Sequence, residues 1–302
     1  MTPTLRPLSF SEMLDRAFVL SVRTVLPMAA VIGLTVGLGF GGAWTMVYVG
    51  VVFAHAPGIA PAIIACVFLF AVIVAGCGAA LTGQIDAYFG RPVQLSRMLT
   101  GARRTWPQLS LLFIIYLAIC GLLAGIVIAL FYAGVWFGGH LPFIRIWPGA
   151  IIGIGFLILF VCLIIALYGF VFSLGYVAFV GCVAEWSPAL EAWERGWKRS
   201  AADGRAWRTT GYGALILFGG FAVTLAFQLM GLGIAALFPK GTLLSGLATS
   251  GPVVLSNLFY YVFQLAFFVV YYADLRIRTE GLDLAIQSDS LEPVAAGAPA
   301  EA

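Results

Sequence analysis

The feature that most constrains this chain is a series of six long apolar runs. None of the runs contains Asp, Glu, Lys, Arg or His in its interior. A helix of about 20 residues crosses the roughly 30 Å of hydrocarbon in a bilayer, and every run reaches that length. The sequence therefore predicts an all-α integral membrane protein with six transmembrane helices. The predicted spans are residues 26–53, 61–81, 109–137, 146–183, 212–238 and 252–273.

The overall composition excludes a soluble globular protein. Of the 302 residues, 62% are apolar and only 10% are charged, whereas an average soluble domain carries about 25% charged residues. The net charge of +3 is too small to indicate a nucleic-acid partner, because the basic residues flank apolar runs instead of forming a separate basic domain.

The basic residues predict which side of the membrane each connection occupies. Lys and Arg collect in the cytoplasmic loops of membrane proteins. Fourteen of the 16 basic residues lie in alternate segments, and only Arg145 and Lys240 lie in the others. Both termini are therefore expected in the cytoplasm, and the expected location is the bacterial cytoplasmic (inner) membrane.

The fourth run is longer than one span requires, so a break into two helices near Gly169 is an alternative. That break would move the basic segment 185–208 to the outside and remove the charge asymmetry. We therefore favour one tilted, kinked or protruding helix for residues 146–183.

The connecting segments predict three repeats of an amphipathic interfacial helix followed by a helical hairpin. The amphipathic segments are 9–25, 92–106 and 187–200. In the first, Ser9 and Glu12 form an S-x-x-E capping box before an apolar stripe. In the third, Ser187 and Pro188 are typical of the N-cap and first position of a helix. One membrane domain is expected over residues 1–287, followed by a disordered cytoplasmic tail, 288–302.

Few residues in the sequence suggest catalysis or metal binding. All five cysteines lie inside apolar runs, and the two histidines, His55 and His140, lie in external loops without a carboxylate or cysteine. No G-x-S-x-G, H-E-x-x-H or P-loop pattern is present. We therefore predict no catalytic residues, no metal site, no cofactor and no enzymatic activity.

Two mid-span amides form the candidate intramembrane polar pair, Gln228 and Gln264. An unpaired amide is unfavourable in hydrocarbon, so a hydrogen bond between the two helices is the favoured interpretation, with a substrate site as the alternative. Gly33, Gly37 and Gly41 follow a G-x-x-x-G spacing. This spacing favours packing within the chain, with a dimer interface as the alternative.

Tryptophan and arginine residues gather near the expected cytoplasmic ends of the spans. Such residues anchor helices at the interface, and they also suit contact with anionic lipid or a protein partner. The candidate contact residues are Trp197, Arg199, Arg205, Trp207, Arg208, Arg276 and Arg278.

Three stretches resemble a known family. They are the opening segment 6–18, the segment 187–211 with its Trp-Lys-Arg-Ser and Gly-Arg-Ala-Trp-Arg motifs, and the closing segment 271–284. Together they resemble the bacterial membrane-domain family named after glycerophosphoryl diester phosphodiesterases. The resemblance implies a multi-pass membrane domain. Some members carry a separate soluble catalytic domain, which we do not expect in this chain.

These observations support three hypotheses about function. The first is a non-catalytic multi-pass inner-membrane protein whose cytoplasmic face contacts anionic membrane lipids or a partner protein of unknown identity. The second is a transporter or channel for a neutral or amphipathic solute, with Gln228 and Gln264 along its path. The third is an enzyme of lipid metabolism. The sequence leaves the substrate, the partner and the oligomeric state open.

Overall fold

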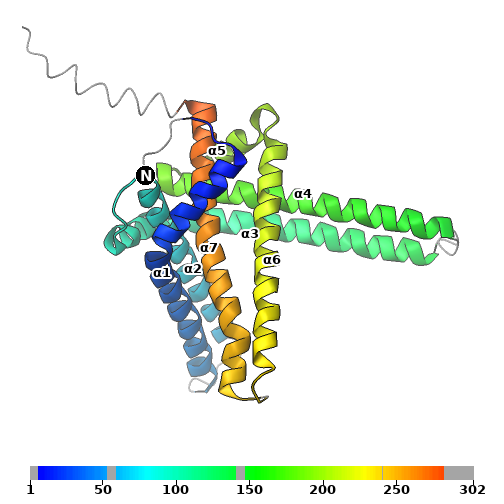
Figure 1. Ribbon diagram of the computed structural model, residues 1–302, viewed down its shortest axis with the longest axis horizontal. Helices are drawn as coiled ribbons and strands as arrows, with labels where there is room; N and C mark the ends of the chain where they lie inside the picture. Colours follow the sequence, from blue (N-terminus) through cyan, green and yellow to red (C-terminus); the bar gives the residue numbers. More distant parts are fainter. Residues whose placement is uncertain (1–5, 53–58, 141–146, 240, 282–302) are drawn as a thin grey trace, which may run out of the picture. The chain divides into compact units, whose positions relative to one another are not determined.

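The structure, a computed structural model, describes residues 6–52, 59–140, 147–239 and 241–281 (Figure 1). Side chains are described for all of these except residues 52, 131, 133–140, 147–160, 162–163 and 203. The described part is helical and contains no strand. The elements are α1 (Phe10–Val52), α2 (Ile59–Tyr88), α3 (Leu95–His140), α4 (Trp147–Glu185), α5 (Ala189–Ala201), the 3₁₀ helix η2 (Ala202–Gly204), α6 (Ala206–Ala235) and α7 (Leu243–Glu280).

Six of these helices are long and apolar enough to cross a membrane, which confirms the predicted fold class. Their most apolar stretches have mean hydropathies between 1.9 and 2.9, and only α5 among the α-helices is too short and too polar. The fourth apolar run forms the single helix α4 of 39 residues, so the alternative of a break near Gly169 is wrong. The predicted tail, 288–302, lies outside the described residues.

The first two amphipathic segments are continuous with the helices that follow them. Helix α1 has 43 residues and passes through Pro27, and α3 has 46 residues and passes through Pro107. A helix of this length extends more than about 60 Å, roughly twice the hydrocarbon thickness. Each helix can therefore place its polar first part outside the hydrocarbon. The ribbon of α1 changes direction between these two parts (Figure 1), as expected where proline removes a backbone hydrogen bond.

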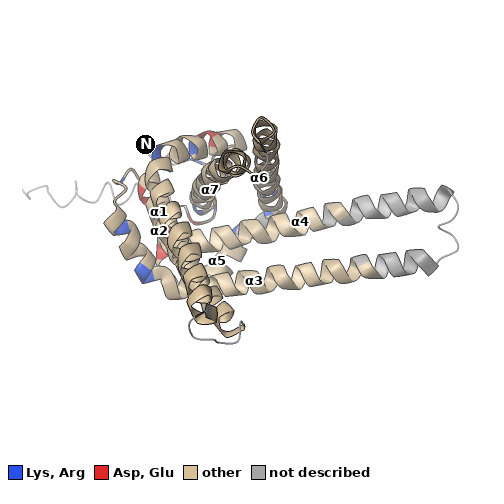
Figure 2. Cartoon of the chain, turned by 90° about the horizontal axis from the view of Figure 1, so that it is seen from below, with Lys and Arg blue, Asp and Glu red and all other residues tan. Residues whose placement is uncertain are grey.

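The helices belong to two compact units, which we describe separately. Unit 1 comprises residues 1–106, 180–187 and 254–302, and unit 2 comprises residues 107–179 and 188–253. Helices α1 and α2 belong to unit 1, together with the first turns of α3, the end of α4 and most of α7. Charged residues of α1 and α2 are confined to one end of each helix, and the rest of both helices is uncharged (Figure 2).

Helix α7 is the central helix of unit 1. Every residue from 264 to 275 is buried, and a helix that is apolar around its whole circumference is typically a core helix. Phe10 of α1 contacts Phe267 edge to face, and Met13 and Ala17 on the same side of α1 are fully buried. The apolar stripe predicted in segment 9–25 therefore packs against protein.

Glycines bring α1 and α2 close together, but they are not the ones that the sequence pattern indicated. A Cβ on Gly39 would lie 3.0 Å from Leu69, and one on Gly42 would collide with Phe68. By contrast, a Cβ on Gly33, Gly37 or Gly41 would meet no described atom within 4 Å. The stripe thus lies on the side of α1 that faces away from α2, and its packing within the chain stays a prediction.

The opening and closing segments of the family-like pattern bind each other. The backbone N–H of Leu8 donates to Oδ1 of Asp274 at 2.7 Å, and Arg278 donates to the carbonyl oxygen of Leu8 at 2.8 Å. Asp274 also pairs with Arg278 at 2.8 Å and is only 1% exposed. These bonds, which we call the terminal clasp, fix the start of α1 against the end of α7. Ser9 and Glu12 form the predicted capping box beside it.

A second polar contact joins three helices of unit 1. Gln84 of α2 is fully buried, and its amide donates to Oγ1 of Thr24 at 2.9 Å and to the carbonyl oxygen of Val262 at 3.4 Å. A buried amide in an apolar environment is stabilised only where it finds such partners. Gln84 therefore fixes the positions of α1, α2 and α7 along one another.

Unit 2 is built on a close crossing of α4 and α6. A Cβ on Gly169 would lie 2.9 Å from the carbonyl oxygen of Thr210, so this glycine permits the helices to approach and does not break α4. Helix α5 begins at Ala189, whose N–H donates a hydrogen bond to the side-chain oxygen Oε1 of Gln108 at 3.0 Å. The prediction of Ser187 as the N-cap is wrong, because Pro188 occupies that position and makes no side-chain bond.

Candidate functional site

The candidate site of unit 1 begins at the sharp turn that ends α2. Gly90 has a φ of 72°, its N–H donates to Ala87 O at 3.1 Å, and the Arg91 N–H donates to Asp86 O at 2.8 Å. This pair of bonds is a Schellman motif, which needs a residue in the left-handed region at the glycine position. The turn reverses the chain and places Arg91 beside the last turn of α2.

Asp86 is the acidic centre of the site. Its side chain is only 6% exposed, and its Oδ1 lies 3.3 Å from Arg97 and 3.6 Å from Arg91. A buried carboxylate requires such partners, because losing its hydration is costly. Its other oxygen, Oδ2, is buried and has no hydrogen-bond partner among the described residues.

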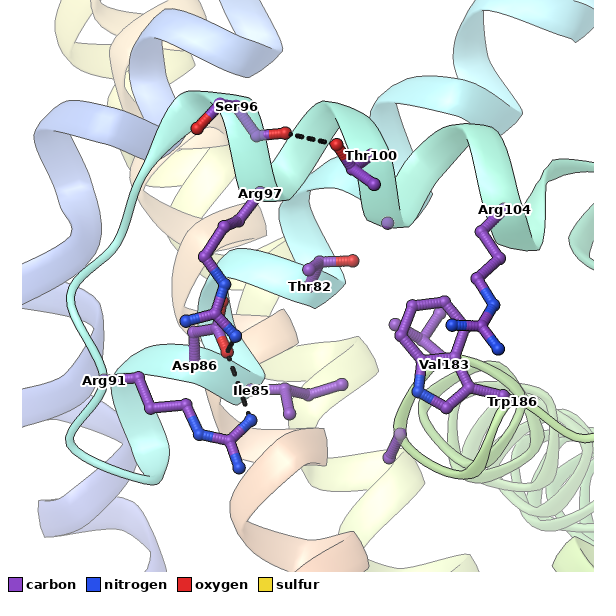
Figure 3. Close-up of a pocket in the computed structure, with 12 residues that line it drawn as sticks. Thr82, Ile85, Asp86, Arg91, Ser96, Arg97, Thr100, Arg104, Val183 and Trp186 are labelled. Carbon is purple, nitrogen blue, oxygen red and sulfur yellow. Dashed lines mark hydrogen bonds and ion pairs between the residues drawn. The ribbon is translucent and has the colours of Figure 1, made fainter.

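The first turns of α3 form one wall of a cavity of about 330 Å³ (Figure 3). A Cβ on Gly101 would lie 2.7 Å from Cγ2 of Thr82, so only glycine lets α3 cross α2 this closely. The spacing of the α3 residues puts one face of the helix toward the cavity. The lining residues are Thr82, Ile85, Asp86, Arg91, Ser96, Arg97, Thr100, Gly101, Arg104, Val183, Ala184 and Trp186.

Arg104 and Trp186 lie at the end of the cavity away from Asp86 (Figure 3). The guanidinium carbon of Arg104 lies 4.3 Å from the centre of the Trp186 ring, a cation–π contact (Figure 3). Trp186 follows the end of α4 and has a φ of 54°. This conformation is unusual for a bulky residue and costs of order 1–3 kcal/mol, so the surrounding fold must hold the ring in place.

The cavity carries an excess of positive charge. Three arginines line it, against the single carboxylate of Asp86. Within the part of the chain that the structure describes, Arg104 forms neither an ion pair nor a hydrogen bond, and its guanidinium group lies over the Trp186 ring. The contacts of Arg91 and Arg97 with Asp86 are longer than ordinary hydrogen bonds. All three guanidinium groups therefore have N–H donors to offer to an anion.

A second, smaller cavity of about 230 Å³ adjoins Arg91 in unit 1 and includes one of the predicted contact residues. It is lined in part by Tyr88, Tyr272 and Arg276. Arg276 lies 3.5 Å from Glu185 and 2.9 Å from Glu280, and the Tyr272 hydroxyl donates to Glu185. The charge of Arg276 is thus balanced within unit 1, as that of Arg278 is in the terminal clasp.

The other five predicted contact residues lie in unit 2. Trp207 is 81% exposed and Trp197 is 50% exposed, with its ring against Phe170. Arg199 is buried at 6% exposure. Arg205 donates to the carbonyl oxygen of Ala202 at 3.0 Å, and Arg208 donates to the Tyr212 hydroxyl at 2.6 Å. The seven predicted residues therefore do not form one cluster within either unit.

The two intramembrane glutamines also lie in different units. Gln264 is buried in α7, within unit 1, and Gln228 is exposed on α6, within unit 2. Their predicted pairing stays a prediction.

The sequence interpretation missed Asp86, Arg91 and Trp186 as members of a site. Arg97 and Arg104 lie in the predicted amphipathic segment 92–106, but the sequence interpretation does not single them out. One signal was available: Arg97, Thr100 and Arg104 recur at spacings of three and four, which places them on the same side of a helix. Trp186 could not be found this way, because it follows Arg104 by about 80 residues in the sequence.

Comparisons with known proteins found no match to this chain. No protein-family model matches the chain, and neither the curated proteins nor the solved structures contain a match.

Proposed function

We propose that this protein is a non-catalytic multi-pass membrane protein that binds anionic lipid headgroups at the arginine-lined cavity of unit 1. The observation that carries the proposal is Arg104, which lines a cavity and rests on Trp186 without a carboxylate partner among the described residues. Arginine presents a planar set of donors that suits phosphate oxygens. A phosphate in the cavity would supply the missing counter-charge.

The position of the cavity along the helices supports a lipid as the source of that phosphate. Arg104 lies five residues before the third apolar run begins at residue 109, and Thr82 lies one residue after the second apolar run. These positions correspond to the interface between hydrocarbon and headgroups, where tryptophan is also enriched. The same boundary is expected on the cytoplasmic side of a bacterial inner membrane, whose anionic surface attracts arginine.

The test compares two neighbouring arginines in the purified full chain. Arg104→Gln removes a charge from the cavity, whereas Arg103→Gln removes the same charge from an exposed position on α3 outside the lining. We expect Arg104→Gln to weaken binding to vesicles of phosphatidylcholine with phosphatidylglycerol by about fivefold, since one interfacial cation contributes about 1 kcal/mol. Arg103→Gln should weaken binding by less than about twofold, because Arg103 does not line the cavity.

Equal losses for the two variants would show diffuse attraction to the membrane surface and would overturn the cavity as the binding site. Binding by the unaltered chain that is no stronger with phosphatidylglycerol than with phosphatidylcholine alone would overturn the proposed function itself.

A further inference from the structure

The chain carries an anionic segment of its own directly after α7. Residues 282–302, which we call the acidic tail, contain Asp283, Asp289, Glu292 and Glu301 and no Lys, Arg or His. The cavity of unit 1, by contrast, is lined by three arginines and a single carboxylate. Opposite charges attract each other within a screening distance of about 8 Å at physiological salt. The acidic tail is therefore complementary in charge to the cavity.

The end of α7 lies beside one wall of the cavity. Arg276 lies 2.9 Å from Glu280, the last residue of α7, and 3.5 Å from Glu185. Glu185 immediately precedes Trp186, which lines the cavity. Gly281 then has a φ of 61°, the left-handed conformation that commonly ends a helix and turns the chain away from its axis. The acidic tail therefore begins near Trp186, in the same unit as the cavity.

The length of the tail is sufficient to reach both ends of the cavity. Asp289 and Glu292 follow Glu280 by nine and twelve residues, and each residue of an extended chain spans at most about 3.6 Å. The two acidic residues are three positions apart, so their separation can be as large as about 10 Å. Arg97 and Arg104 are seven positions apart on α3, which corresponds to a rise of about 10 Å. The two spacings are similar.

Tethering favours occupation of the cavity by a weak ligand. A group attached to the same chain has an effective concentration of order millimolar at a site that it can reach. Ion pairs that contribute little as separate contacts are then enough to compete with a ligand from outside. Among the described residues Arg104 has no carboxylate partner, and Arg97 has donors to offer beside its contact with Asp86.

We propose that the acidic tail binds in the arginine-lined cavity, with the carboxylates of Asp289 and Glu292 at Arg104 and Arg97, and that an anionic headgroup must displace it. The tail is then an autoinhibitory segment that sets how much anionic lipid is needed for binding. The competition rests on the proposed function, whereas the contact between tail and cavity does not.

The contact is tested first without lipid, by disulfide trapping in detergent. In a chain from which the five native cysteines have been removed, Thr100→Cys places a thiol in the cavity lining and Ser290→Cys places one in the tail. The matched control adds Asp289→Asn and Glu292→Gln, which removes two charges and leaves the reach unchanged. We expect the disulfide within one chain to form about fivefold more slowly in the control, because two ion pairs are lost.

Equal rates of disulfide formation with the charged and the neutral tail would overturn the contact. Arg104→Gln in the chain with the charged tail should also slow the reaction, and an unchanged rate would overturn the role of Arg104 in holding the tail. A disulfide that links two chains into a dimer would overturn the contact within one chain and assign the cavity to the tail of a second copy.

The competition is tested by vesicle binding of the full chain with its native cysteines. Asp289→Asn/Glu292→Gln should bind vesicles of phosphatidylcholine with phosphatidylglycerol about fivefold more tightly than the parent. Glu191→Gln/Glu194→Gln makes the same change in net charge at exposed positions on α5, and it should strengthen binding by less than about twofold. Neutralising the tail of the Arg104→Gln variant should likewise change binding by less than about twofold.

The outcomes separate this inference from the proposed function. Equal gains in the tail variant and the α5 variant would show an effect of net charge and overturn autoinhibition. A loss of lipid binding in Arg104→Gln, with no gain from neutralising the tail, would overturn this inference alone. Trapping of the charged tail, with no variant preferring phosphatidylglycerol to phosphatidylcholine, would overturn the proposed function and the competition while supporting the contact.

Discussion

Single buried polar residues determine how unit 1 is held together. In hydrocarbon or in a protein core a polar group must find a partner, so each such residue specifies one arrangement of its neighbours. Asp274 accepts bonds from Leu8 and Arg278, and Gln84 donates to Thr24 and Val262. The bond to Leu8 fixes the segment just before α1, and the bonds of Gln84 join α2 to α1 and α7 at defined positions, whereas the many apolar contacts tolerate sliding.

The variant Asp274→Ala tests the terminal clasp. Removing this 1% exposed carboxylate deprives the Leu8 N–H of its bond to Oδ1 and Arg278 of its paired charge. We expect a loss of about 3 kcal/mol in the free energy of unfolding, the cost of breaking one side of a buried ion pair. Unfolding of the purified protein in detergent, followed against temperature or denaturant, measures this loss.

The matched control for the clasp is Glu194→Ala on α5. Glu194 forms an exposed pair with Lys198 at 2.6 Å, and the hydrogen bond from that ammonium lowers the pKa of the carboxyl group. Exposed pairs of this kind contribute little to stability, so this variant should unfold like the parent. A loss in Asp274→Ala no larger than that in the control would show that the clasp is not a stabilising contact.

At the scale of helices, the apolar runs predict how many helices cross the membrane but not where each helix begins and ends. The runs correctly predicted six membrane helices, because the hydrocarbon requires an apolar stretch of fixed length. The runs did not predict the helix ends accurately, since a helix can continue beyond the hydrocarbon into polar sequence. Segments 9–25 and 92–106 are predicted as elements separate from the spans that follow, yet α1 and α3 continue through Pro27 and Pro107 without a break.

Residues of the candidate site were harder to predict than the spans, for a physical reason. Asp86 follows the second apolar run and has the character of an exposed loop residue, but α2 continues to Tyr88 and the turn at Gly90 covers the carboxylate with Arg91. Trp186 reaches the same cavity only because the end of α4 packs in unit 1. These contacts depend on tertiary structure, which local sequence patterns do not contain.

The crossing of α2 and α3 predicts different effects on stability for two Gly→Ala variants of α3. Gly101→Ala places a methyl group against Thr82, whereas Gly121→Ala on the same helix meets nothing within 4 Å. We expect Gly101→Ala to destabilise the protein by about 1–3 kcal/mol through overpacking. Gly121→Ala should be neutral or stabilising by up to about 1 kcal/mol, because alanine favours the helix.

Thermal unfolding of both glycine variants provides the measurement, and lipid binding by Gly101→Ala provides a further check. The methyl group added by Gly101→Ala should also weaken binding of anionic lipid, since it separates the walls of the cavity. Equal stability of the two variants would contradict the close approach of α3 to Thr82.

For the whole molecule, orientation in the membrane is the property on which the functional proposal depends. Fourteen of 16 basic residues lie in segments predicted to be cytoplasmic, and the candidate cavity lies among them. A cavity on that side would face the anionic lipids of the inner leaflet and the soluble ligands of the cytoplasm. The opposite orientation would expose it to a different set of molecules.

Site-directed labelling measures this orientation in cells. In a chain from which the five native cysteines have been removed, Lys198→Cys is a suitable reporter, because the side chain at this position is 72% exposed. The neighbouring Arg199 is buried at 6% exposure and would react poorly. A membrane-impermeant maleimide should label Lys198→Cys only in inverted vesicles, since basic loops remain in the cytoplasm.

Thr242→Cys is the opposite control for the labelling experiment. This residue is exposed, lies before α7 in a connection predicted to be external, and should react in intact cells. Labelling of Lys198→Cys from outside intact cells would reverse the predicted topology.

The terminal clasp has a consequence for how the protein is made. Leu8 and Asp274 are separated by 266 residues. At ribosomal speeds of about 5–20 residues per second, residue 8 emerges roughly 13 to 50 s before its partner. During that interval the first helix has been inserted but its buried side has no α7 to cover it. The nascent protein therefore depends on the insertion machinery, or on lipid, to shield Phe10 and Met13 until translation reaches the last helix.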